Sequence, residues 1–181
     1  MQERAVPEPF VVEPWWRRFG FIARELLRQI ARQPWDPLPR LILADFLEEN
    51  GANARAEFIR LQVKYMAERS GWSDADKWTE RERELWSQHR AEWLEGLPRL
   101  LWWVWGGLVE GVEVDSVEQL QEARRHIDVR RVRWRAGTAG LLRSGPLFEG
   151  VVSLEATYQG FGDEGAAALA QSPNLQNLTT L

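Results

Sequence analysis

The chain has 181 residues, with 23 Lys and Arg against 27 Asp and Glu and a formal net charge of -4. This length suits one domain or two small ones, and the 44% hydrophobic content is typical of a globular protein. No run reaches the ~18 apolar residues of a transmembrane helix, and the slightly acidic balance argues against a general nucleic-acid binder. The absence of Cys excludes disulfides and thiolate catalysis, whereas the 11 Trp are unusually many.

Residues 1–14 predict a polar N-terminal tail rather than a secretory signal. They combine charged side chains with three prolines and contain neither an apolar core nor a small-residue cleavage site. We therefore expect a cytoplasmic protein whose first domain begins near residue 15.

The next segment, residues 15–98, predicts about four helices. Apolar residues recur at helical spacing from Trp16 to Ile30, and Pro34 ends this first helix. Asp36 is suited to begin a second helix as its capping residue, and Gly51 is suited to end it.

Two further helices are expected before residue 98. The third begins near Ala54 and ends at Gly71. For the fourth, Ser73 and Asp76 resemble a capping box, in which two residues three apart satisfy each other's backbone N–H groups. Its expected apolar face carries Trp78, Leu85, Trp86, Trp93 and Leu94.

Residues 99–181 predict alternating strands and helices. The apolar run 100–105 is interpreted as a joint whose rings cover the open edge of the first strand. Strands are expected at 108–115, 129–135 and 151–155, with a helix over 117–127 and an Ala-rich helix over 163–171.

A 20-residue period relates the three expected strands and predicts a parallel sheet. Apolar-x-apolar strands with a period in the twenties are typical of leucine-rich repeats. The alignment places two apolar rows inward, Val112/Val132/Val152 and Val114/Trp134/Leu154, and two polar rows outward, Glu113/Arg133/Ser153 and Asp115/Arg135/Glu155.

Two segments resemble known families. The string Pro39–Gly51, followed by Arg55–Gln62, resembles the bacterial repeat-companion domain, a short helical module found ahead of repeat arrays. Residues 160–170, followed by 173–181, resemble a ribonuclease-inhibitor-type leucine-rich repeat. The resemblances imply an α/β protein in which a helical cap, residues 15–98, packs on a short parallel repeat-like sheet, residues 99–181, whose last repeat is incomplete. No reaction and no cofactor are implied.

Two other functions compete with this interpretation. Asp45 and Glu57 belong to an acidic cluster that could perform hydrolase-like acid–base chemistry. The arginines of residues 124–135 form a basic patch that could contact nucleic-acid phosphates, although Trp134 is expected to face inward and could not stack on a base.

The favoured prediction is a non-enzymatic scaffold that binds a protein partner, without metal or cofactor and without a membrane. The partner is expected to contact the outward strand positions by charge complementarity. These positions are Glu113, Asp115, Arg131, Arg133, Arg135, Ser153 and Glu155.

Overall fold

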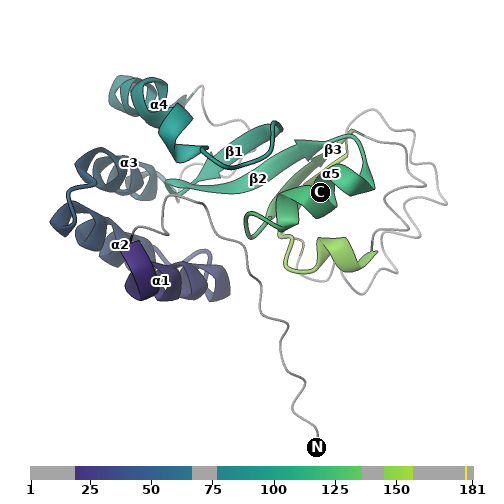
Figure 1. Ribbon diagram of the computed structural model, residues 1–181, viewed down its shortest axis with the longest axis horizontal. Coiled ribbons are helices and arrows are strands. Elements are labelled where there is room, and N and C mark those ends of the chain that lie inside the picture. Colours follow the sequence, from purple (N-terminus) through teal and green to yellow (C-terminus); the bar gives the residue numbers. More distant parts are fainter. Residues whose placement is uncertain (1–18, 67–76, 136–144, 157–177, 179–181) are drawn as a thin grey trace, which may run out of the picture.

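The computed structural model describes residues 19–66, 77–135, 145–156 and 178, and within them the chain is mixed α/β, as predicted (Figure 1). Helices α1, α2 and α3 pack consecutively at one end of the sheet, and α4 packs on α3. The elements are α1 (Gly20–Arg32), α2 (Leu38–Glu49), α3 (Asn53–Lys64), α4 (Glu80–Trp93), β1 (Leu101–Trp105), β2 (Leu108–Val114), α5 (Val117–Arg124), β3 (Arg131–Trp134), the 3-10 helix η3 (Gly145–Phe148) and β4 (Ser153–Glu155).

The four expected N-terminal helices are present, but two boundaries differ from the prediction. The Asp36 carboxylate accepts the Leu38 N–H at 2.9 Å, as its expected role at the start of α2 requires. Helix α3 ends at Lys64 instead of Gly71, because the next N–H groups bond to carbonyls three residues back. Helix α4 begins at Glu80, and Ser73 and Asp76, where a capping box was predicted, lie outside the described residues.

The capping box of α4 is formed by Thr79 and Glu82. The Glu82 N–H donates to the Thr79 hydroxyl at 3.2 Å, and the Thr79 N–H donates to the Glu82 carboxylate at 2.6 Å. The other carboxylate oxygen of Glu82 accepts from Gln62 of α3 at 2.7 Å. This buried side chain therefore both starts α4 and ties it to α3.

Three tryptophans on and just before α4 serve packing, as predicted, whereas Trp35 is 51% exposed. Phe58 is fully buried and touches the rings of Trp78, Trp86 and Trp93 at centroid distances of 4.9–6.0 Å. These rings join α3 to α4 and to the segment that precedes α4. Edge-on and tilted ring pairs add roughly 0.5–1.5 kcal/mol each beyond their burial.

Within the described residues, the sheet has four strands in the order β1-β2-β3-β4. The three later strands are parallel, as predicted, and β1 pairs antiparallel with β2. The run 100–105 therefore covers the edge of β2 as an additional strand. The sequence did not predict this strand, because the apolar residues of the run are uninterrupted and do not alternate with polar ones.

The predicted register is correct between β2 and β3 and wrong between β3 and β4. Val112 lies opposite Val132 and Val114 opposite Trp134, but Val132 lies opposite Leu154 instead of Val152. The second step is thus 22 residues long. Because a slip of two residues keeps strand residues on the same face, Leu154 faces inward as predicted. Val152 precedes β4, and Val151 joins the inward core in its place.

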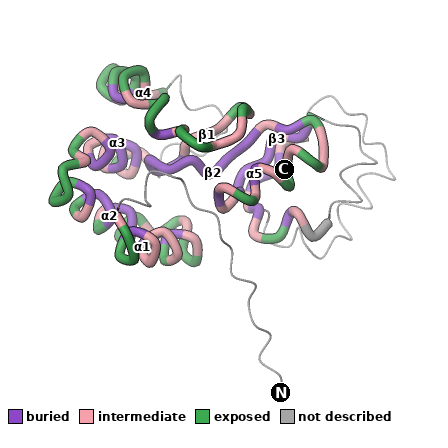
Figure 2. Tube along the Cα trace, viewed as in Figure 1, coloured by how far each residue is buried: buried purple, intermediate pink, exposed green. Residues whose placement is uncertain are grey.

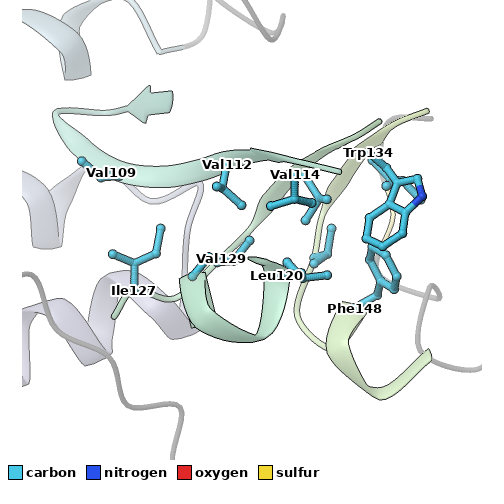
Figure 3. Packing of buried hydrophobic residues seen from close by; sticks show 12 residues of the cluster. Val109, Val112, Val114, Leu120, Ile127, Val129, Trp134 and Phe148 are labelled. Carbon is cyan, nitrogen blue, oxygen red and sulfur yellow. The ribbon is translucent and has the colours of Figure 1, made fainter. Parts of the chain in front are cut away.

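The inward face of the sheet packs against α5 and η3 (Figure 3). Val112, Val114 and Trp134 point from the strands toward Leu120 of α5 and Phe148 of η3, and all five are at most 1% exposed. The Trp134 and Phe148 rings meet edge-on at 5.9 Å. Trp134 therefore faces inward, as predicted. Figure 2 shows β2 and β3 as largely buried, whereas most of β1 is intermediate or exposed.

A buried ion pair joins the helices to the sheet. The Arg40 guanidinium on α2 donates to the Glu110 carboxylate on β2, and both side chains are almost inaccessible to solvent. The same guanidinium donates to the carbonyl oxygens of Trp105 at 3.3 Å and Gly106 at 3.4 Å. Arg40 thus fixes α2 against the turn that connects β1 to β2.

This turn requires two glycines. Gly106 and Gly107 have φ of 53° and 84°, in the left-handed region that favours glycine. A Cβ on Gly106 would lie 2.9 Å from the Arg40 guanidinium carbon, and one on Gly107 would lie 2.6 Å from the Ile59 Cα. The turn is therefore pressed against both α2 and α3.

A second contact ties α1 to the start of β3. The Arg130 guanidinium donates to the Ala31 carbonyl in the last turn of α1 and to Asp128 at 2.8 Å. Leu108, the first residue of β2, is buried among apolar residues of α1, α2 and α3. Helices and sheet consequently share buried contacts across their junction.

The Gly107→Ala substitution is expected to destabilise the fold by more than about 2 kcal/mol. The left-handed conformation alone costs about 1–2 kcal/mol for a residue with a Cβ, and the clash with the α3 backbone adds to it. Gly51→Ala is the matched control, because Gly51 has φ of 81° with no atom within 4 Å of its added Cβ. Urea denaturation measures both, and equal losses would contradict the close packing of the turn.

Removing one partner of the buried ion pair is expected to lower the free energy of unfolding more than removing both partners does. Glu110→Leu leaves the Arg40 charge buried without a counter-charge, for which we expect a loss of about 3–5 kcal/mol. The double variant Arg40→Met/Glu110→Leu leaves no buried charge and should be more stable than the single variant. A double variant whose loss equals the sum of the two single losses would contradict this account.

Candidate functional site

The outward face of the sheet carries a row of alternating charges. Arg133 of β3 lies between Glu113 of β2 and Glu155 of β4 in the register of the sheet. Its guanidinium is 2.9 Å from the Glu155 carboxylate and 3.4 Å from that of Glu113. The three side chains are 18%, 18% and 30% exposed for Arg133, Glu113 and Glu155, so solvent screens these pairs only in part.

Tryptophan rings of β1 lie under the guanidinium groups of this face. The Arg131 guanidinium lies 3.9 Å from the Trp105 ring centroid, and that of Arg133 lies 4.4 Å from the Trp103 centroid. Gly111 of β2 makes room for this arrangement. A Cβ there would lie 2.9 Å from the Trp103 Cβ and 3.1 Å from the Arg131 Cβ.

The predicted contact residues divide into three groups, which are buried, exposed and of intermediate exposure. Arg131 and Ser153 are only 5% and 3% exposed, so they do not lie on the surface as their outward assignment suggested. Arg135 and Asp115 are exposed at the end of the charged row, and the Arg135 Nε lies 3.8 Å from the Glu113 carboxylate. Glu113, Arg133 and Glu155 are brought together between these two groups.

The contacts of Trp103, Trp105 and Gly111 with this face were not predicted from the sequence. The spacing of the two tryptophans is a usable signal, because two residues that are two positions apart in a strand share one face of the sheet. The signal can be used only once residues 101–105 are known to form a strand. We name the surface formed by Trp103, Glu113, Arg133, Arg135 and Glu155 the charged sheet face.

The expected basic patch is divided: Arg131, Arg133 and Arg135 share the outward face of the sheet, whereas Arg124, Arg125 and Arg130 contact other neighbours. Arg124 donates to the Leu147 and Glu149 carbonyls at 2.9 Å each, and its burial lowers the pKa of the guanidinium. Arg125 pairs with Glu122 at 2.6 Å. Arg130 bonds to α1 at the junction of helices and sheet, and Arg133 pairs with Glu113 and Glu155. These arginines therefore contact different parts of the molecule.

The acidic cluster is divided between two arginines. The Arg60 guanidinium donates to the carboxylates of Asp45 and Glu48 at 2.7 Å each. The Arg81 guanidinium donates to both carboxylate oxygens of Glu57 at 2.7 and 2.8 Å. Asp45 and Glu57, the two carboxylates of the hydrolase hypothesis, are therefore held by different arginines.

These hydrogen bonds also set the acidity of the cluster. The Arg60 hydrogen bond holds the pKa of Glu48 below its ordinary value, and the Arg81 hydrogen bond does the same for the pKa of Glu57. Within the described ranges, no three His, Asp or Glu side chains are grouped to hold a metal ion.

Comparison with known proteins does not assign the chain to a family: no protein-family model, curated protein or solved structure matches it. In the described part of the chain, no helix is both long and apolar enough to cross a membrane.

The Arg60→Gln substitution is expected to raise the pKa of Glu48 toward its ordinary value and leave that of Glu57 unchanged. Arg81→Gln should do the converse, because each arginine controls its own carboxylate. Since the folded-state pKa values are lowered, the stability these pairs contribute is present above about pH 4.3 and lost as the pH falls. Carboxyl chemical shifts followed during a pH titration measure both values, and one variant that moves both would contradict the separation.

Proposed function

We propose that the chain is a non-enzymatic protein–protein interaction module in which a helical cap, residues 15–98, adjoins a leucine-rich-repeat-like sheet, residues 99–181. The observation that carries the proposal is the in-register parallel ladder of β2, β3 and β4, with an apolar row against α5 and η3 and a charged row opposite. Strand spacings of 20 and 22 residues support the repeat-like interpretation.

The charged sheet face supports binding by a rigid surface. Ion pairs and ring contacts hold Arg133 and Glu113 in place, so these side chains lose little conformational freedom when a partner arrives. Arg135, with a side chain 55% exposed, and exposed Asp115 remain accessible beside them. Such charges contribute mainly to the rate of association and to specificity.

Arg133 is a poor position for testing this surface. Reversing its charge would place three carboxylates in one row and remove the ring contact with Trp103, so a loss of binding could reflect damage to the sheet. Arg135, which follows β3, is the better position. Its side chain is 55% exposed, so solvent screens the like-charge contact with Glu113 that its reversal creates.

Arg135→Glu is expected to weaken partner binding at least fivefold without changing the thermal unfolding midpoint appreciably. Arg125→Glu is the matched control, because Arg125 is exposed at the C-cap of α5, the helix that packs on the opposite face of the sheet. The full chain and both variants are used as bait, captured proteins are quantified by mass spectrometry, and the affinity of a purified candidate is then measured for all three. A candidate bound equally by Arg135→Glu and the wild type would contradict the proposed surface.

A further inference from the structure

Strand β1 forms one edge of the sheet in the described part of the chain. It stands at the end of the strand order, next to β2, and Figure 1 shows it at the margin of the sheet. Its sequence, LWWVW, contains neither a charged side chain nor a proline, which are the usual means of keeping edge strands apart. Leu101, at its start, is 63% exposed. An edge of this kind can accept a further strand.

The hydrogen bonds of β2 determine which backbone groups of β1 are used within the sheet. The Val114 carbonyl accepts from the Arg135 N–H at 2.7 Å, so the backbone groups of Val114 face β3. Backbone groups of successive strand residues point in opposite directions, so those of Glu113 face β1, where Glu113 lies opposite Leu101. By the same alternation, Leu101 and Trp103 direct their N–H and C=O groups toward β2.

The N–H and C=O groups of Trp102 and Val104 consequently point away from β2, to the open edge. In the described part of the chain, neither residue forms a backbone hydrogen bond outside the sheet. The Trp102 indole donates to the Pro98 carbonyl at 2.9 Å, which fixes this side chain without using its backbone groups. Two residues of β1 therefore offer main-chain donors and acceptors to another strand.

The positions of these groups are complementary to themselves. When a second β1 runs antiparallel and Trp103 of both copies lies at the centre, Trp102 of each copy lies opposite Val104 of the other. Each such pair exchanges both of its N–H···O bonds, and the two Trp103 rings become neighbours in a favourable cross-strand pair. A pairing centred on Trp102 would instead need the Leu100 N–H, which already donates to the Pro98 carbonyl at 2.8 Å.

From this self-complementarity we propose that the chain forms a symmetric dimer in which β1 pairs antiparallel with β1 of a second copy. Because both copies use the same residues, the contact closes after two chains and does not propagate. The two sheets become one, with both charged sheet faces on the same side, and the exposed Leu101 lies beside Trp105 of the second copy. The dimer does not rest on the proposed partner binding, whose test position, Arg135, lies outside β1.

Sedimentation equilibrium and amide exchange of the full chain test the dimer. The average mass is expected to rise with concentration from 21.0 kDa toward twice that value, in the micromolar range because the paired strands are short. The N–H groups of Trp102 and Val104 should exchange at least tenfold more slowly in the dimer than in the monomer, whereas that of Trp103, which faces β2, should change little. A mass that stays at 21.0 kDa up to about 1 mM, or exchange at Trp102 and Val104 that is independent of concentration, would overturn the proposal.

A proline at the open edge provides a second test. Val104→Pro removes the N–H that faces the edge, and edge strands tolerate proline at such positions. It should weaken dimerisation at least tenfold, whereas Val104→Thr, which retains the N–H and the branched shape, should dimerise as the wild type does. Circular dichroism checks that Val104→Pro is folded, and if it is not, the exchange experiment on the wild type decides. Arg135→Glu should also dimerise normally, and a dimer that is lost in Arg135→Glu but kept in Val104→Pro would refute pairing through β1.

Discussion

The buried ion pair between Arg40 and Glu110 is the interaction on which the arrangement of helices and sheet depends. Neither charge can be left alone in the interior, because the desolvation cost of an unpaired buried ion is several kcal/mol. Arg40 also donates to two carbonyls of the β1–β2 turn. One side chain of α2 therefore determines where the first hairpin of the sheet lies.

The remaining contacts of the junction follow from this placement. The hairpin turn can approach Arg40 and Ile59 this closely only because Gly106 and Gly107 carry no Cβ. With the turn in place, Leu108 enters the core of the helices, and β2 presents its edge to β3. The parallel ladder is thus built outward from a strand that the helices already hold.

On the outward face of the sheet, packing buries some of the residues that were predicted to contact a partner. Strand alternation places Arg131 and Arg133 on the same face as the acidic residues. The rings of Trp105 and Trp103 cover part of that face, so Arg131 becomes buried and Arg133 becomes part of a rigid array. Accessible charge is left mainly at the end of the row, at Arg135 and Asp115.

The sequence by itself determined the elements that depend on local periodicity: α1 to α4, α5, the three parallel strands and the inward direction of Val112 and Trp134. Only the tertiary structure decided the pairing of Arg40 with Glu110, the 22-residue step to Leu154 and the burial of Arg131. Helical and strand periods follow from backbone geometry within a few residues. The partner of a buried ion, the register of paired strands and the burial of a side chain depend instead on which distant segments come into contact in the folded chain. Local sequence patterns do not contain this information.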